Sequence, residues 1–248
     1  MKRVFLWITY FLLSLIFLLP FIGIFLNSMN FKMWEYVLKS GQTYNSLLTT
    51  FWVVVITMVI NFLIGTPIAS FMARENFRGK MFMEFLIALP LIIPTMVSTM
   101  GIQFAFIKMN LIETSLGVAI VHSVTTMPYY IQSMRAGYVT LNKDYINLGK
   151  VLGANAMERF LKITLPIIYP SFLVGMSLVI IVSLAQYLVT FIIGGGQIMT
   201  LPILMMPYLV DGGVTNGTVY SIIYVAFTYF LVFLVDRTVK NIYRKREY

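Results

Sequence analysis

The sequence lacks cysteine and is poor in charge, and both shortages limit what the protein can be. With no cysteine among its 248 residues, it can form neither a disulfide framework nor a thiolate metal site. Only 11% of the residues are charged, whereas an average soluble domain is about one quarter charged. Apolar residues take their place: 59% of the chain is hydrophobic, including 20 Phe and 17 Met. This composition predicts a protein whose solvent is lipid.

Residue types that carry catalysis are scarce as well. His122 is the only histidine, and we expect it to be a hydrogen-bonded helix-packing residue. A base for a membrane protease is the weaker alternative, because no Gly-x-Ser-x-Gly motif or paired aspartates accompany it. No Gly-x-x-x-x-Gly-Lys-Ser/Thr loop is present, so the chain is not expected to bind ATP in that way. We predict no catalytic residue, no metal ligand and no enzymatic activity.

Six apolar stretches are long enough to cross a bilayer, which takes about 20 residues. Each must be helical, because lipid offers the backbone no hydrogen-bond partners, so the predicted fold class is an all-α membrane protein with six transmembrane helices. The first stretch is longer than the about 7–15 apolar residues of a signal peptide, and we expect it to be retained. The predicted spans are about 4–26, 47–72, 81–106, 116–134, 167–191 and 219–235. Segment 198–210 is too short and proline-broken to span, and we expect it to be interfacial or re-entrant.

Basic residues are distributed unevenly around these spans. If the N-terminus is inside, only Lys32, Lys39 and Lys108 of the 18 Lys and Arg lie outside. The positive-inside rule then predicts cytoplasmic N- and C-termini, which accounts for the net charge of +9 without nucleic acid. Ionisable groups are almost missing from the span interiors, and Glu84 lies near a cytoplasmic edge. That scarcity disfavours a proton- or sodium-coupled carrier.

A cytoplasmic segment, about 135–166, separates the fourth and fifth spans. Its apolar residues fall at helical spacing and Gly153 interrupts them, which predicts a pair of short helices. Prolines inside spans predict kinked helices, which suit a cavity or a moving gate. Polar groups in the spans could line a path, although bonding between helices is their commoner use. The candidate path and gate residues are Pro90, Pro94, Gln103 and Gln186.

The cytoplasmic segment also carries a more specific pattern. Gly153 and the Ile-x-Leu-Pro run ending at Pro166 are spaced as in the EAA loop of ABC importer permeases, which this chain resembles. The triplet Glu-Ala-Ala is replaced by Asn-Leu-Gly, and Asp144, one turn earlier, could substitute for the glutamate. The candidate coupling residues are Asp144, Asn147, Leu148, Gly149, Gly153, Ala154, Ile163, Leu165 and Pro166. Residues 77–80, 89–94 and 185–202 extend the resemblance, the last towards the thiamine, polyamine, iron(III) and phosphonate branch, with thiamine-like members closest.

The resemblance implies a type I ABC importer permease, a single transmembrane permease domain over residues 1–248 in a bacterial cytoplasmic membrane. Its implied partners are a dimer of ABC ATPase subunits, a second permease subunit, an extracytoplasmic solute-binding protein and the lipid bilayer. ATP and Mg²⁺ would be bound by the ATPase, and this chain would bind no cofactor. It would translocate a small solute by alternating access. The alternative is an ATP-independent channel or a secondary carrier.

Overall fold

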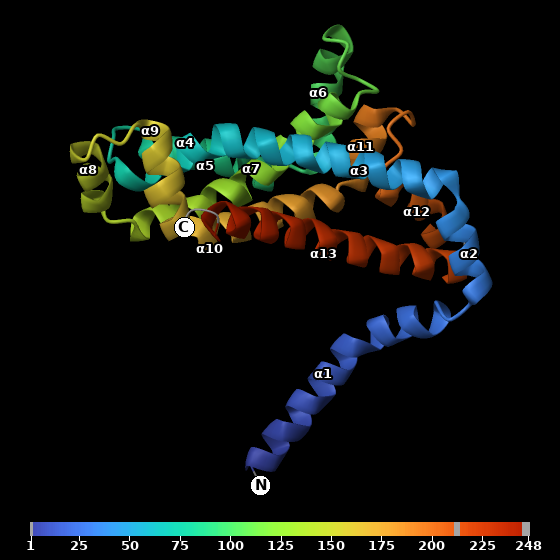
Figure 1. The fold of residues 1–248 in the computed structure, drawn as a ribbon. Coiled ribbons are helices and arrows are strands. Elements are labelled where there is room, and N and C mark those ends of the chain that lie inside the picture. Colours follow the sequence, from blue (N-terminus) through green and yellow to red (C-terminus); the bar gives the residue numbers. More distant parts are fainter. Residues whose placement is uncertain (1, 211–213, 245–248) are drawn as a thin grey trace.

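The computed structural model describes residues 2–210 and 214–244, and this part of the chain is helical (Figure 1). In chain order the elements are α1 (Lys2–Asn27), α2 (Phe31–Lys39), α3 (Gly41–Ile60), η1 (Asn61–Gly65), α4 (Thr66–Arg74), α5 (Lys80–Ile92), α6 (Thr95–Lys108), α7 (Ser115–Thr140), α8 (Lys143–Val151), α9 (Ala156–Arg159), η2 (Phe160–Thr164), α10 (Leu165–Leu184), α11 (Tyr187–Gly194), α12 (Leu201–Val210) and α13 (Val214–Arg244). The two η elements are π-helical turns inside longer helices.

Helix α7 is the centre of the body, where α10, α3 and α4 pack around it. Half of its 26 residues are buried, among them His122 and several hydroxyl residues. Helices α7 and α10 approach closely at Gly137. A Cβ added there would lie only 2.7 Å from the Cβ of Ser171, so the absence of a side chain permits the contact. Small residues at such a crossing let two membrane helices come together.

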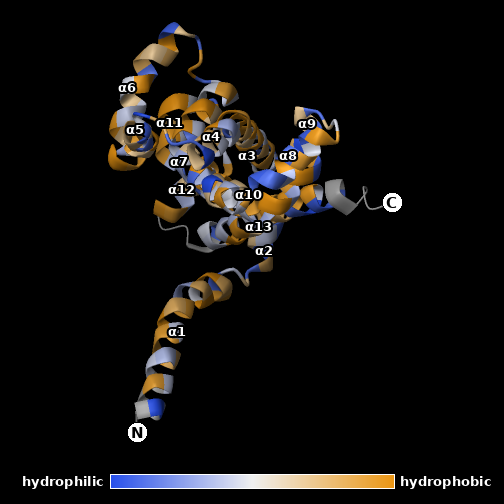
Figure 2. Ribbon diagram, turned by 90° about the vertical axis from the view of Figure 1, so that its left-hand side faces the viewer, coloured by the Kyte–Doolittle hydropathy of each residue, from blue (hydrophilic) through white to orange (hydrophobic). Residues whose placement is uncertain are grey.

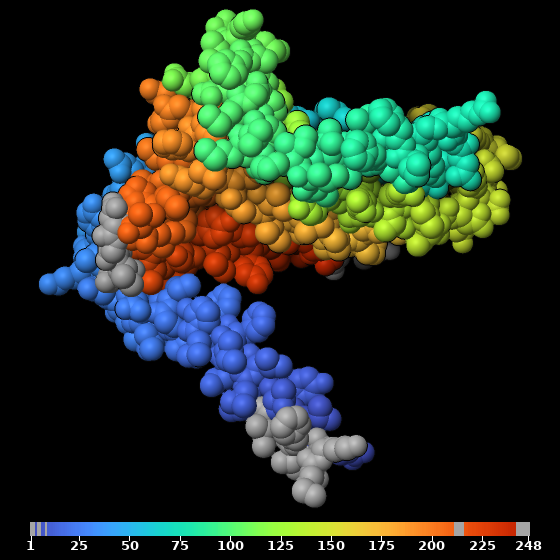
Figure 3. Space-filling view, turned by 180° about the vertical axis from the view of Figure 1, so that it is seen from behind, coloured from blue at the N-terminus to red at the C-terminus, as the bar shows by residue number. Residues whose placement is uncertain are grey.

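Helix α1 stands apart from the body. It contacts α13, but none of its apolar stretch is buried (Figures 1 and 3). Figure 2 shows α1 as mostly hydrophobic along its length. A helix that is apolar all round belongs in lipid or against another protein.

Four stretches of the described residues are long and apolar enough to cross a membrane: Thr9–Asn27, Gly41–Arg74, Ala156–Leu184 and Asn216–Asn241. The pair α5 and α6 would make a fifth. Helix α7 corresponds to the predicted run 116–134 and is long enough, but its hydroxyl, amide and histidine side chains dilute its apolar residues. The count of six spans stays a prediction.

Two predicted spans are interrupted in the structure. The run 81–106 consists of α5 and α6, which are bent by 100° at Ile93 and Pro94. Ile93 takes an extended conformation, as a residue before proline prefers, and Pro94 lacks the N–H that would continue α5. The run 167–191 consists of α10 and α11, separated by Ala185 and Gln186. Segment 198–210 holds the ten-residue helix α12.

The π-helical turns occupy equivalent places in two helices. Each directly precedes a residue–proline pair, Thr66-Pro67 after η1 and Leu165-Pro166 after η2. A wider turn accommodates a ring that removes one backbone hydrogen bond and crowds the preceding turn. Pro166 therefore lies within a continuous helix instead of starting one. The rings of Phe62 in η1 and Phe160 in η2 pack against each other, with centroids 6.0 Å apart.

Candidate functional site

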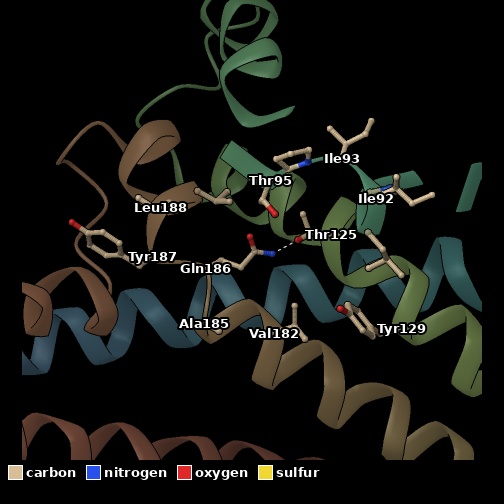
Figure 4. A pocket seen from close by; sticks show the side chains of 14 residues that line it. Ile92, Ile93, Thr95, Thr125, Tyr129, Val182, Ala185, Gln186, Tyr187 and Leu188 are labelled. Carbon is tan, nitrogen blue, oxygen red and sulfur yellow. Dashed lines mark hydrogen bonds between the residues drawn. The ribbon is translucent and has the colours of Figure 1, made fainter. Parts of the chain in front are cut away.

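The two interrupted helices meet at a cavity of about 520 Å³. The bend between α5 and α6 forms one wall, the break between α10 and α11 forms another, and α7 contributes the floor (Figure 4). The volume lies in the range of about 300–1,000 Å³ that is usual for small-molecule sites. Its lining residues are Pro90, Leu91, Ile92, Ile93, Pro94, Thr95, Thr125, Tyr129, Val182, Ala185, Gln186, Tyr187, Leu188 and Val189.

This lining is polar without being charged. Its hydrogen-bonding side chains include Thr95, Thr125, Tyr129 and Gln186, and no Asp, Glu, Lys, Arg or His is among the lining residues. The amide of Gln186 donates to the hydroxyl of Thr125 across the cavity floor (Figure 4). Helices α6 and α11 both begin at the wall, so the partial positive charge of two helix N-termini lies beside the cavity.

Three of the four predicted path and gate residues come together here. Pro90, Pro94 and Gln186 line the cavity, although Gln186 is nearly 100 residues further along the chain. Gln103 is not among the lining residues. Its side-chain amide instead donates to the carbonyl oxygen of Ile192 at 3.5 Å. Gln103 is therefore a contact between α6 and α11, which is the helix-bonding use of a polar residue.

Behind the break lies a buried polar cluster built around His122. Its Nδ1 is 2.9 Å from the hydroxyl of Ser183 on α10, and its Nε2 is 3.1 Å from the hydroxyl of Thr190 on α11. All three residues are about 2% exposed. The histidine is bonded as the sequence suggests, but its two partners could not be identified from the sequence because they lie 61 and 68 residues away.

The predicted coupling segment, about 135–166, includes the last turns of α7, which ends at Thr140, and then α8, α9 and η2. Helix α8 ends in a left-handed turn at Gly153, whose φ is +78°. Gly153 N–H donates to the carbonyl of Lys150, and Ala154 N–H donates to the carbonyl of Gly149, which is the Schellman arrangement. The next helix begins with a capping box, in which Asn155 and Glu158 each bond the other's backbone N–H.

The substituted triplet has a packing explanation at its third position. Gly149 is buried, and a Cβ there would lie 2.6 Å from the Cδ1 of Ile163. Glycine thus lets α8 lie directly on η2. Asn147 and Leu148 are exposed, and so is Asp144, whose backbone N–H is capped by Asn142.

The tip of α8 carries two strongly exposed apolar side chains. Val151 and Leu152, at the tip of α8, are 84% and 77% exposed. Of the remaining predicted coupling residues, Leu165 is buried at the start of α10 and Pro166 is half-buried beside it. The Asn155 N–H and then Lys162 hold the pKa of the Glu158 carboxyl below its ordinary value, because both stabilise the charged form.

Residues 65–248 match the family described as the inner membrane component of binding-protein-dependent transport systems, and the chain belongs to this family. It is therefore a transport subunit of ABC importers and not an enzyme. It is 23% identical over 216 residues to a putative molybdenum transport system permease of Bacillus subtilis, covering 81% of this chain and 95% of that one.

Other relatives differ in the solutes that their names give. The chain is 28% identical over 159 residues to a molybdate/tungstate permease of Pyrococcus abyssi, a match that spans 63% of each chain. It is 24% identical to a spermidine/putrescine permease of Haemophilus influenzae, over 77% of this chain and 73% of that one. Its fold resembles that of a bacterial ABC transporter that imports alginate, with a TM-score of 0.73 at 18% identity and 96% of each chain covered. The all-helical, type I importer fold is thereby confirmed.

Proposed function

We propose that the chain is the membrane-spanning permease of an ATP-driven importer in a bacterial cytoplasmic membrane. It would cross the membrane six times with both termini inside, pair with a second permease and an ABC ATPase dimer, and receive a small solute from an extracytoplasmic binding protein. ATP and Mg²⁺ would be bound by the ATPase. The observation that carries the proposal is the coupling segment, an apolar tip on a rigid turn that continues into a membrane helix.

One continuous helix connects the region of that tip with the cavity. The stretch Ala156–Leu184 is one helix of 29 residues, about 44 Å long at 1.5 Å per residue. It starts beside the exposed tip of α8 and ends at the break that lines the cavity. Movement of an ATPase bound to the tip would shift this helix as a rigid body and change the cavity wall.

The test of coupling is Gly153→Asp in the purified complex. Any side chain at φ +78° is strained, and a carboxylate there also enters the apolar tip, so we expect solute uptake to stop while the protein still inserts. Gly79→Asp is the matched control, because Gly79 has φ +93° and open space around it but lies outside the segment. Normal uptake in Gly153→Asp would refute the coupling role.

The exposed helix α1 favours the proposal that a second permease subunit is present. Such a long apolar surface, with none of its spanning stretch buried within the chain, is available to a neighbouring subunit in the membrane. Cross-linking through single cysteines on α1 is expected to join two permease chains in membranes. The cysteine-free sequence leaves no background for that experiment.

For the solute we propose a small oxyanion. Relatives are named for molybdate, tungstate and sulfate, and the cavity offers hydroxyl and amide donors without a carboxylate. A polyamine is the competing candidate, because one relative is a spermidine/putrescine permease, but a polycation would find no acidic partner among the lining residues. We expect molybdate or sulfate, and not spermidine or thiamine, to stimulate ATP hydrolysis by the complex with its binding protein.

The alternative is a channel or carrier that works without ATP. Purification of the tagged chain from its own membranes separates the two possibilities. An importer permease retains an ABC ATPase and transports only when ATP is hydrolysed. Solute flux from the chain alone in liposomes would favour the alternative.

A further inference from the structure

His122 is the only side chain seen to bond both sides of the break between α10 and α11 within the described residues. Ser183 is next to the last residue of α10, and Thr190 lies in the first turn of α11. The imidazole therefore spans the interruption from α7, the most central helix. We propose that His122 is a positioning residue that fixes the α10–α11 break, and through it Gln186, against α7.

The hydrogen-bond directions support this role. The hydroxyl of Thr190 donates to the carbonyl oxygen of Gln186 at 2.9 Å, so its single proton is already committed. The neutral tautomer that fits this direction carries its proton on Nε2, which donates to Thr190, while Nδ1 accepts from the hydroxyl of Ser183. In this tautomer one chain of hydrogen bonds runs from Ser183 through the imidazole and Thr190 to the backbone carbonyl of Gln186.

The side chain of Gln186 is tied to the same helix by an independent contact. Its amide donates to Thr125, which lies three residues after His122 on α7, and Thr125 in turn donates to the carbonyl of His122 at 2.9 Å. Gln186 is thereby held at its carbonyl and at its side chain. Its backbone forms an inverse γ-turn, with φ −87° and ψ 57°, in which the Tyr187 N–H donates to the carbonyl of Ala185 at 3.1 Å and the regular pattern of α10 ends.

The role explains why so polar a cluster is buried. Without the imidazole, two buried hydroxyls would have no interhelical partner, and a small void beside them would grow. That void is now only about 10 Å³, enough for at most one water. Helices α10 and α11 would then be able to move independently at the cavity wall. The inference rests on the proposed function, because a fixed break is useful where ATP-driven movement arrives along α10.

The first experiment measures the position of α11 directly and needs only the permease chain. Spin labels are placed at Val124→Cys on α7 and Phe191→Cys on α11, both exposed positions in a chain with no other cysteine. With His122 present we expect one narrow distance distribution in nanodiscs. His122→Ala is expected to broaden it towards longer distances. An unchanged distribution would overturn the proposal, whatever the transport result.

The second experiment uses the complete complex and measures ATP hydrolysis with and without the loaded binding protein. We expect His122→Ala to lower the stimulated-to-basal ratio about tenfold, as the loss of two buried hydrogen bonds suggests. His122→Gln keeps one donor and one acceptor, and should stay within about threefold of the wild type. Ser123→Ala is the control, because that buried hydroxyl bonds only its own helix, at Ala119.

A triple variant separates positioning from simple stability. His122→Leu, Ser183→Ala and Thr190→Val together leave no orphaned hydroxyl, so thermal stability should return towards that of the wild type. The link to Gln186 is still absent, so stimulation should remain low. Recovery of stimulation along with stability would refute the positioning role, and the triple variant also serves if His122→Ala does not fold. Failure of the wild-type complex to couple ATP to transport would instead count against the proposed function.

Discussion

Helices α1 and α7 have the same length, 26 residues, and opposite characters. The apolar stretch of α1 has no buried residue, while α7 has half of its residues buried and is less apolar than the four long stretches that could cross a membrane. In a soluble protein the more apolar helix would be the inner one. Lipid reverses the order, because hydrocarbon solvates leucine as well as a protein interior does, and only the interior offers partners to hydroxyls and imidazole.

The largest contrast should appear in reactivity to water-soluble reagents. Thr95 lines the cavity, and Phe17 on α1 is 78% exposed in the isolated chain. Each is replaced by cysteine in a separate variant. We expect a membrane-impermeant maleimide to label the first and not the second, because the surface of α1 is covered by lipid or a second subunit. Labelling of Phe17→Cys in intact membranes would show that α1 does not lie in the bilayer.

Glycine substitutions should give the largest difference in stability. Gly137→Val places new atoms within 3 Å of Ser171, where α7 and α10 meet, and is expected to lower the free energy of unfolding by about 3 kcal/mol. Gly23→Val on α1 has no atom within 4 Å of the added Cβ and should change it little. Thermal unfolding in detergent measures both. Equal destabilisation would mean that α1 is packed as tightly as α7.

Hydroxyl removal should show the same contrast at a smaller scale. Thr126 on α7 accepts a hydrogen bond from Asn61 at 2.8 Å, so Thr126→Val should cost about 1 kcal/mol. Ser14 on α1 bonds only its own helix, and Ser14→Ala should be close to neutral. The same unfolding measurement applies. A larger loss at Ser14 would reveal an interhelical partner for α1.

The ion pair between α5 and α7 should contribute still less. Glu84 and Arg135 approach to 2.8 Å, but each side chain is nearly 40% exposed. A double-mutant cycle with Glu84→Gln and Arg135→Gln is expected to give about 0.5 kcal/mol of coupling. A value above about 2 kcal/mol would indicate that the pair is buried in the assembled transporter.

Acid should have the smallest effect, since it acts on the predicted coupling segment, which is exposed, and not on α1 or α7. The pKa of Glu158 is lowered in the folded chain, so its contribution to stability is present above the ordinary glutamate pKa of about 4.3 and is lost as pH falls through the lower, folded value. The protection of the amides of residues 155–158 against hydrogen exchange, relative to their intrinsic rate at each pH, should fall below that range. Asn155→Ala should remove this pH dependence, because it takes away the reciprocal cap.

The sequence allowed the membrane class, the pair of short helices around Gly153 and the interruption near Pro94 to be predicted, because these depend on local patterns; the coupling and gate roles of these residues stay predictions. Gly153 and Pro166 stand at a fixed spacing in the sequence, and Pro94 lacks the backbone N–H that would continue a helix. The break at Gln186 could not be predicted, since 167–191 is continuously apolar in outline and what supports the break lies on α7. Gln103 and Gln186 are chemically alike, and only their places in the fold separate a helix contact from a cavity residue.

The π-helical turn η2 affects the direction in which the apolar tip of α8 points. A π-turn holds one more residue than a regular turn, which is equivalent to a single-residue insertion in an α-helix. One residue corresponds to about 100° of rotation around the helix axis. The residues that precede Phe160, including the apolar tip at Val151 and Leu152, are therefore turned by that angle relative to a regular continuation of α10. If the tip binds the ATPase as proposed, one extra residue in η2 sets the direction from which the two subunits meet.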